Sequence, residues 1–287
     1  MLAVVGLLLL FVAVFGAFIG GGGNIMVVIA ALPMEMSIIG GSAIAALLIA
    51  NSKSEIMDIL GGVKLVFKGP RHGRQDYLDC ILLVAKLMKM LKTDGPVALE
   101  PHIEDPDNSA IFKDCPNLML DRPLIFLICD TLRLVVVSSG TLDPRAVEEV
   151  MDNAIKNHHH EVMKPAKSLQ SMADALPALG IVAAVLGVIK TMGSIAEPPE
   201  VLGGYIGSAM VGTFLGVFLG YGIVGPFSSR VGGIIDADAA IYDVVKQMII
   251  ASLHGHPQPL VIEAARSGIE HSNQPSFAEV FDGMRAR

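Results

Sequence analysis

The stretch "LPALGIVAAVLGVIK", Leu176–Lys190, is almost wholly apolar and has the composition of a helix that crosses a bilayer. Such a helix needs about 20 mostly apolar residues. Pro177 stands at the entrance of the stretch, which contains no carboxylate that could carry an ion. The question is what function a nearly apolar membrane helix with a proline at its start has in this protein.

Apolar residues make up 52% of the 287-residue chain and charged residues only 17%, which is more apolar than a soluble domain. The first apolar window lacks the basic start and the cleavage site of a secretory signal, so it is interpreted as a retained span. The sequence predicts an all-α integral membrane protein with four transmembrane helices, within Met1–Ile19, Pro33–Ala50, Leu176–Met192 and Leu202–Val224.

The positions of lysine and arginine predict the orientation of these spans. The first such residue is Lys53, after the second span; Lys164 and Lys167 precede the third span and Arg230 follows the fourth, whereas the connections Gly20–Leu32 and Gly193–Val201 contain none. The positive-inside rule places these flanks, both termini and the long middle segment in the cytoplasm, and the two short connections outside. The net charge of −7 argues against nucleic acid as a partner.

Four segments follow from this topology. We expect a first transmembrane hairpin over residues 1–52, a cytoplasmic domain over 53–167, a second hairpin over 168–227 and a cytoplasmic tail over 228–287. Ile25–Leu32 is apolar but too short for a span, so it is interpreted as a re-entrant or interfacial piece.

The middle segment and the tail have the patterns of amphipathic helices. Residues 74–92 place apolar side chains on one face and lysines on the other. Asp143 is expected as an N-cap with Pro144 at the first helical position. The tail contains a helix that stops at Gly255, and Ser276 with Glu279 has capping-box spacing.

The third and fourth spans contain the most informative residues. Gly212, Gly216 and Gly220 are spaced by four, which allows membrane helices to approach closely and is most simply a packing feature. Thr213 either bonds to its own helix or faces a water-filled path. Pro177, like Pro226, is either a tolerated proline near a helix end or a hinge.

Ionisable residues are missing from the middle of all four predicted spans. Glu35 and Asp174 lie at span edges. A membrane ion pathway usually contains an ionisable group, because such a residue is costly to keep in the membrane. If the protein conducts protons, the titrating carboxylate is therefore expected on a second chain.

No metal centre or enzyme site is expected. The consecutive histidines His158–His160 point in different directions on a helix, so they cannot all reach one ion. The three cysteines, Cys80, Cys115 and Cys129, match no zinc spacing and are interpreted as reduced packing residues. The sequence contains no Walker A, GxSxG or HExxH motif. The charges of Lys92 and Glu100 flank a turn and are suited to contact with a partner, or form a solvated face.

Several motifs together resemble the MotA family of flagellar motor stator subunits, part of the MotA/TolQ/ExbB proton channel family. The resemblance covers nearly the whole chain, and it rests on "GGSAIAALLIANS", "GPVALEPHIEDPDNSAIF", "LPALGIVAAVLGVIKTMGS", "GSAMVGTFLGVFLGYGIVGPFSS" and "NQPSFAEVF". It implies a homopentamer in the bacterial inner membrane, around a MotB-like subunit that supplies the titrating aspartate and the peptidoglycan anchor. Ion flow would then drive torque on the rotor protein FliG.

The resemblance also implies roles for single residues. Pro177 and Pro226 match the family's two functional prolines, and Thr213 matches a threonine that lines the ion path. Lys92 and Glu100 match the charged pair that faces the rotor; Lys92 replaces an arginine and so keeps the charge without the planar fork. Sodium-type relatives carry a hydroxyl where this chain has Ala183 and Ala184, so protons are expected as the coupling ion and no cofactor is expected.

Three other readings remain open. ExbB and TolQ proteins use a related mechanism to energise envelope processes, but they have three spans where this chain shows four. A structural scaffold would pass no ions. A solute transporter would carry its own polar site at mid-span or broken helices, which the sequence does not show.

Overall fold

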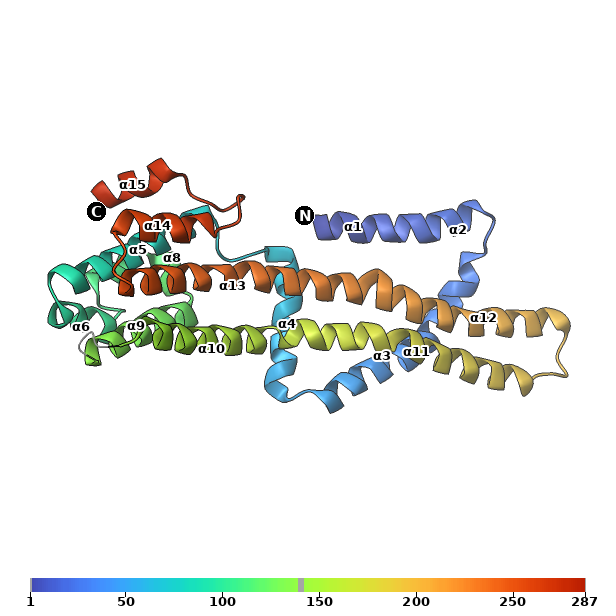
Figure 1. Ribbon diagram of the computed structural model, residues 1–287. Coiled ribbons are helices and arrows are strands. Elements are labelled where there is room, and N and C mark those ends of the chain that lie inside the picture. The colour runs from blue at the N-terminus through green and yellow to red at the C-terminus, as the bar shows by residue number, and fades with distance from the viewer. Residues whose placement is uncertain (1, 139–141, 287) are drawn as a thin grey trace. The chain divides into compact units, whose positions relative to one another are not determined.

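The computed structural model describes residues 2–138 and 142–286, and all regular structure in these residues is helical (Figure 1). The elements are α1 (Leu2–Phe11), the π-helical η1 (Val12–Gly16), α2 (Ala17–Gly20), α3 (Ile25–Ala50), α4 (Lys53–Lys68), α5 (Arg74–Thr93), α6 (Pro96–Glu104), α7 (Ala110–Lys113), α8 (Pro116–Met119), α9 (Arg122–Val137), α10 (Pro144–Val162), α11 (Lys164–Met192), α12 (Pro199–Val217), the π-helical η2 (Phe218–Val224), α13 (Gly225–Leu253), α14 (Gln258–Ser267) and α15 (Phe277–Ala286). Four helical runs are long and apolar enough to cross a membrane: Leu2–Gly20, Ile25–Ala50, Lys164–Met192 and Pro199–Leu253. The predicted fold class is confirmed.

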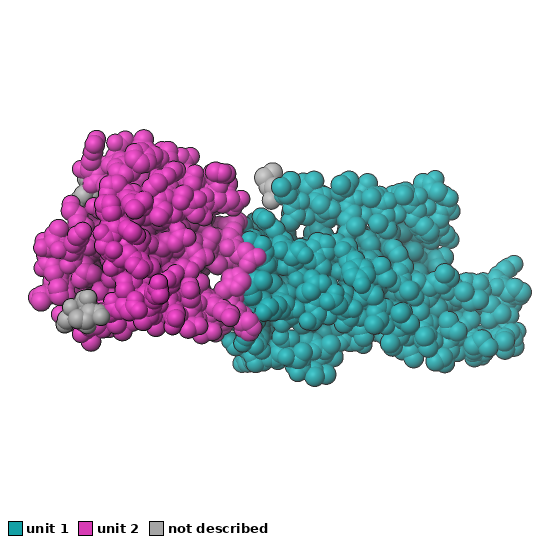
Figure 2. All heavy atoms as spheres, viewed as in Figure 1, with its two compact units in different colours: residues 1–69, 163–234 teal, residues 70–162, 235–287 magenta. Residues whose placement is uncertain are grey.

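The chain divides into two compact units, coloured separately in Figure 2. Unit 1 contains residues 1–69 and 163–234, and unit 2 contains residues 70–162 and 235–287. These units reflect which residues pack together and do not place a membrane. The predicted division into hairpins, cytoplasmic domain and tail therefore stays a prediction.

Unit 1 is built on close packing between α11 and α12, which run side by side as a hairpin (Figure 1). A Cβ atom added at Gly180 would lie 2.8 Å from the Gly212 carbonyl oxygen, and one at Gly216 would lie 2.6 Å from the Leu176 carbonyl oxygen. Only glycine allows two backbones to approach so closely. The predicted packing role of these glycines is confirmed.

The second span differs from its prediction at its beginning. Residues 25–32 are the first turns of α3, not a separate re-entrant piece, and Pro33 lies inside the helix. The side chain of Asn24 caps this helix by accepting a hydrogen bond of 3.0 Å from the Met26 backbone N–H. The span is therefore longer than predicted, and Glu35 lies within it and not at its edge.

Helices α11 and α13 also extend beyond their predicted ends. Helix α11 begins at Lys164, so Pro177 lies inside it and not at its entrance. The fourth span and the predicted tail helix form one helical run, Pro199–Leu253, within which Pro226 follows the π-helical η2. The structure thus excludes the reading of both prolines as tolerated residues near helix ends.

The first span packs against the fourth through aromatic rings. Phe11 and Phe15 make edge-to-face contacts with Phe218, with ring centroids 5.4 and 5.5 Å apart. The rest of α1 is apolar on all sides and has no buried residue in this single chain. Such a surface is stable only in lipid or against other membrane helices.

Unit 2 has a continuous apolar core between α5, α9, α13 and the shorter helices. The apolar face of α5 is buried as predicted, and the predicted N-cap at Asp143 accepts a 3.0 Å hydrogen bond from the Arg145 backbone N–H. The capping box of Ser276 and Glu279 is also present, and Gly255 ends the tail helix region with a positive φ of 79°.

Candidate functional site

Pro177 leaves a gap in the hydrogen bonding of α11 at the point where η2 passes. Proline has no N–H, so the carbonyl of Ala173, four residues earlier, loses its helical donor. Gly220 of η2 faces this position: a Cβ there would lie 2.7 Å from the Ala173 oxygen and 3.2 Å from Pro177 Cδ. The glycine allows the two helices to meet at the weakened turn.

Pro226 affects the fourth span in the same neighbourhood. The Gly225 N–H donates to the Gly220 carbonyl, five residues earlier, which is the π-helical pattern. The wider turn leaves room for the proline ring, which would otherwise press on the carbonyl of Gly222. Gly220 thus touches Pro177 and belongs to the turn that accommodates Pro226, so the structure brings the two predicted prolines into one region.

Glu35 lies on the buried face of α3 and was not predicted as a functional residue. It is 1% exposed and belongs to a buried row with a spacing of four residues, which also contains Ala31, Ile39 and Ala43. A Cβ atom at Gly212 would overlap Glu35 Oε2 and lie 3.2 Å from Ala183 Cβ. Glu35 therefore fills the space where α3, α11 and α12 meet.

One oxygen of the Glu35 carboxyl group, Oε2, is buried without a hydrogen-bond partner among the described residues. The other buried oxygen in this condition, Asp76 Oδ1, belongs to a carboxylate whose second oxygen accepts a 2.8 Å hydrogen bond from the Gly73 N–H at the start of α5. The prediction that all four spans lack an ionisable residue in the middle is wrong. The sequence signal for Glu35 is its spacing of four residues from Ala31 and Ile39, which places it on the same helix face as these apolar residues.

Thr213 and Ala184 each follow a residue that borders Glu35. Ala183 and Gly212 are buried beside the carboxyl group, whereas Thr213 is exposed and Ala184 half-buried in this chain. The exposed hydroxyl of Thr213 is available to another chain or to water. Thr213 of α12 and Ala184 of α11 thus each follow in sequence a residue that borders Glu35 of α3, while their own side chains point in another direction around the helix.

Lys92 and Glu100 lie in unit 2 on either side of the turn that joins α5 to α6. Both side chains are exposed, and Gly95 makes the turn with a φ of 82°. No ion pair of either residue is found in residues 2–138 and 142–286. Lys92 also borders a hollow of about 660 Å³, together with Lys89, Pro96, Leu253, His256 and Val261.

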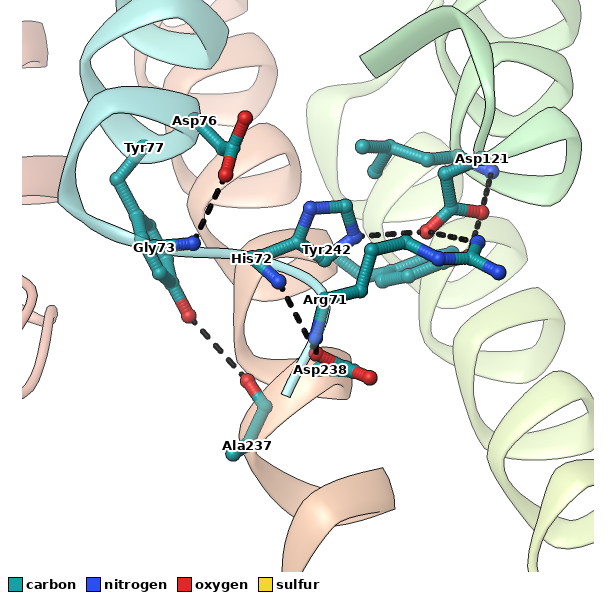
Figure 3. A network of polar contacts seen from close by, with 10 residues as sticks. Arg71, His72, Gly73, Asp76, Tyr77, Asp121, Ala237, Asp238 and Tyr242 are labelled. Atoms are coloured by element: carbon teal, nitrogen blue, oxygen red, sulfur yellow. Dashed lines mark hydrogen bonds and ion pairs between the residues drawn. The ribbon is translucent and has the colours of Figure 1, made fainter. Parts of the chain in front are cut away.

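A polar network in unit 2 was not predicted from the sequence (Figure 3). Asp121 caps α9 and accepts hydrogen bonds of 2.8 Å from both His72 Nε2 and the Tyr242 hydroxyl. Arg71 Nη1 lies 3.8 Å from the same carboxylate. Asp238 accepts from the backbone N–H groups of Arg71 and His72 at 2.7 and 3.2 Å.

The network sets the charge state of Asp121. Burial by itself raises the pKa of this carboxyl, but the hydrogen bonds from His72 and Tyr242 outweigh it, so the pKa lies below its ordinary value. The same burial and the neighbouring Asp121 charge raise the pKa of Tyr242. Asp121 is thus an ionised group whose lone pairs are used, and the network joins segment 71–73, α9 and α13 within unit 2.

The neighbouring histidines His158 and His159 contact different partners, and the cysteines are packed inside. His158 stacks on Tyr242 with ring centroids 5.1 Å apart, whereas His159 Nε2 lies 2.8 Å from Asp236 Oδ1. Among the described residues, no three His, Cys, Asp or Glu side chains converge in a way that could hold a metal ion. All three cysteines are buried, and burial raises the pKa of Cys129 to about 12.

Comparison with known proteins places these features in a family. Residues 4–95 match the motility protein A N-terminal family, and residues 126–243 match the MotA/TolQ/ExbB proton channel family. Motility protein A of Salmonella typhimurium and that of Escherichia coli are each 34% identical over 286 residues, which is 100% of this chain and 96% of the relative. A solved structure of C. jejuni MotAB shares the fold, with a TM-score of 0.74, 17% identity and coverage of 96% of this chain and 98% of that chain.

The family consists of membrane proton channel proteins, which confirms the prediction that the chain is not an enzyme. The full-length identity covers both units, including the spans with Glu35 and the prolines and the helices with Lys92 and Glu100. The chain belongs to the MotA family of flagellar stator proteins, within the MotA/TolQ/ExbB proton channel family.

Proposed function

We propose that this chain, together with a MotB-like partner, forms a proton-conducting stator complex that turns proton flow into torque on the rotor protein FliG. The observation that carries the proposal is the identity of 34% to motility protein A over the full chain. The solved relatives from C. jejuni and Bacillus subtilis are MotAB complexes, which supports a MotB-like partner here. We further propose a homopentamer in the bacterial inner membrane, with both termini, the segment 53–167 and the tail 228–287 in the cytoplasm.

The paired prolines support a conformational step in unit 1. Pro177 weakens α11 where Gly220 of η2 touches it, and η2 is the π-helical turn that precedes Pro226. A π-helical turn can change its hydrogen-bond register at low cost, so the two helices have a local place at which to bend. In the proposed cycle, proton binding near this place changes the bend and moves the attached helices.

Exposed, unpaired charges support the rotor contact. Lys92 and Glu100 lie on either side of the turn at Gly95, and neither forms an ion pair with another described residue. Charges of this kind steer a partner and set its register more than they add affinity. Protons are favoured over sodium because Ala183 and Ala184 provide no side-chain oxygen where sodium-type relatives have a hydroxyl.

Deletion of the gene in the bacterium of origin tests the function directly. We expect cells with assembled but paralysed filaments, and rotation restored by the wild-type copy. Pro177→Ala should abolish rotation, while Lys92→Glu or Glu100→Lys should reduce it partly. The matched control is Lys113→Glu, which reverses a charge on the short helix α7 and should leave rotation unchanged.

Two outcomes would contradict the proposal. Cells that swim normally without the gene, and without a second set of stator genes, would exclude a motor role. If rotation persists but an envelope process fails, the ExbB and TolQ type of function takes its place. Loss of rotation on removal of sodium at a constant proton gradient would overturn the choice of coupling ion.

A further inference from the structure

Glu35 is a buried carboxyl group within the second span, and the proposed function assigns it no role. It lies about 15 Å along α3 from Ile25, at about 1.5 Å per residue, and therefore deep within the span. A buried ionised carboxylate without a partner is among the most costly groups in a membrane. A residue kept under these conditions is by default a functional one, because an apolar side chain would pack there at lower cost.

The surroundings of Glu35 contain no other charge. Helices α11 and α12 pack against α3. Their facing stretches, residues 176–189 and 201–224, contain no Asp, Glu, Lys, Arg or His, and α3 itself contains no second one. The tyrosines of these stretches are Tyr205 and Tyr221, seven residues before and nine after Gly212. No cation among the described residues compensates Glu35, so a bound proton is the simplest way to remove its charge.

Glu35 borders the two helices that carry the predicted path residues. Its carboxyl borders Gly212 and Ala183, the residues immediately before Thr213 and Ala184. Gly212 has no side chain, and any Cβ there would overlap Glu35 Oε2. The carboxyl oxygen thus lies against α12 at Gly212, one residue before the exposed Thr213.

We infer that Glu35 is a proton-binding residue of this chain, which takes up and releases the transported proton where α3 packs against Gly212 of α12. The inference rests on the proposed stator function. In the step, a proton from water or from the partner's carboxylic acid forms an O–H bond with Glu35 Oε2, and the same bond later breaks toward water or the partner's carboxylate. The proton is the only group transferred, and no oxidant or reductant is needed.

The test compares proton uptake by proteoliposomes that contain the complete complex of this chain and its MotB-like partner, reported by a pH-sensitive dye. Glu35→Gln keeps the size of the side chain but cannot exchange a proton, and we expect proton uptake to fall by about tenfold or more. Glu35→Asp keeps a carboxyl and should retain most of the rate. Ser37→Ala, two residues along the same helix, is the matched control and should equal the wild type.

A second readout separates proton binding from packing. Infrared spectra of the wild-type complex should show a carboxylic acid C=O band that Glu35→Gln lacks and Ser37→Ala retains. This measurement stays decisive even if the Gln variant assembles poorly, because the absence of the band from the wild type would overturn the inference.

Three results would contradict the role of Glu35. The first is proton uptake by Glu35→Gln at the wild-type rate. The second is an equal loss of proton uptake in Glu35→Gln and Glu35→Asp, which would indicate a packing role alone. The third is proton uptake by the wild type that requires sodium. If the wild-type complex takes up no protons and cells without the gene still swim, the proposed function itself fails and the inference falls with it. If the wild type conducts and the Gln variant matches it, only the inference about Glu35 fails.

Discussion

Two carboxyl groups, one in each unit, are buried to almost the same extent in opposite surroundings. Glu35 in unit 1 is 1% exposed, and its Oε2 has no hydrogen-bond partner among the described residues. Asp121 in unit 2 is 5% exposed and accepts hydrogen bonds from His72, Tyr242 and the Leu124 backbone. The difference shows that two carboxyl groups buried to a similar extent can differ completely in the hydrogen bonds that their surroundings provide.

The physical distinction lies in what the surrounding groups lose when the carboxyl is removed. Removing Asp121 would leave His72 and Tyr242 as buried donors without an acceptor, which is costly. Removing Glu35 would leave no donor of the described residues unsatisfied at Oε2, because none of them bonds to this oxygen. We therefore expect Asp121 variants to lose stability and Glu35 variants to lose rotation.

The largest effect is expected for Asp121→Ala. Removing one member of a buried, hydrogen-bonded charge network costs about 3–5 kcal/mol. The thermal unfolding of the purified full-length chain in detergent measures this loss. Asp107→Ala is the matched control, because Asp107 forms an exposed pair with Arg122 at 2.7 Å, and such pairs contribute about 0–1 kcal/mol. Equal losses in the two variants would show that the network carries no special stability.

A smaller effect is expected for Gly212→Ala, which tests the packing around Glu35. The added methyl group would overlap Glu35 Oε2 and crowd Ala183, and overpacking of this kind costs about 1–3 kcal/mol. Gly204→Ala in the same helix meets nothing within 4 Å and serves as the control. The two variants are compared by unfolding midpoint and by rotation speed. If Gly212→Ala behaves like Gly204→Ala, Glu35 does not fill the space that the structure assigns to it.

The pH dependence of stability tests whether Asp121 is ionised in the folded chain. The pKa of Asp121 is depressed in the folded chain, so its contribution is present above the ordinary aspartate value of about 4 and is lost as the pH falls through the depressed pKa. Glu55 and Glu279 also titrate in acid, because hydrogen bonds from the backbone N–H groups of Ser52 and Ser276 lower their pKa values to about 2. Comparing the wild type with Asp121→Asn separates the contribution of Asp121 from theirs. The stability difference should shrink below about pH 4. A difference that is constant with pH would contradict an ionised Asp121.

The smallest change in stability is expected for Glu35→Met. An apolar side chain of similar length removes the unpaired carboxyl without leaving a buried donor, so the unfolding free energy should change by less than about 1.5 kcal/mol. Rotation should nevertheless be strongly reduced. A large loss of stability in this variant would mean that Glu35 has a bonding role that its surroundings in this chain do not show.

The sequence predicted the number of spans and the helical middle segment because apolar length and helical periodicity are local signals. The start of the second span was missed because Pro33 was read as a boundary. In the structure the helix continues through Pro33. The local signal for the true start was Asn24, which caps α3 before an apolar run.

The Asp121 network and the π-helical η2 both depend on residues that are far apart in the chain. His72 and Tyr242 approach Asp121 from 49 and 121 positions away, and no spacing rule predicts such a meeting. The π-helical η2 likewise results from how Pro226 and Gly220 are accommodated against α11. By contrast, the choice of Pro177, Thr213 and Pro226 as candidates rests on resemblance to family motifs, and their roles stay predictions.

Measuring Glu35→Gln and Asp121→Asn side by side tests the central contrast most directly. For each variant, the unfolding midpoint of the purified chain and the rotation speed of tethered cells are determined at matched expression. The account predicts that Glu35→Gln keeps the midpoint and slows rotation strongly, while Asp121→Asn lowers the midpoint and slows rotation only as far as less folded protein is present. A Glu35→Gln variant that rotates at the wild-type speed would contradict the account.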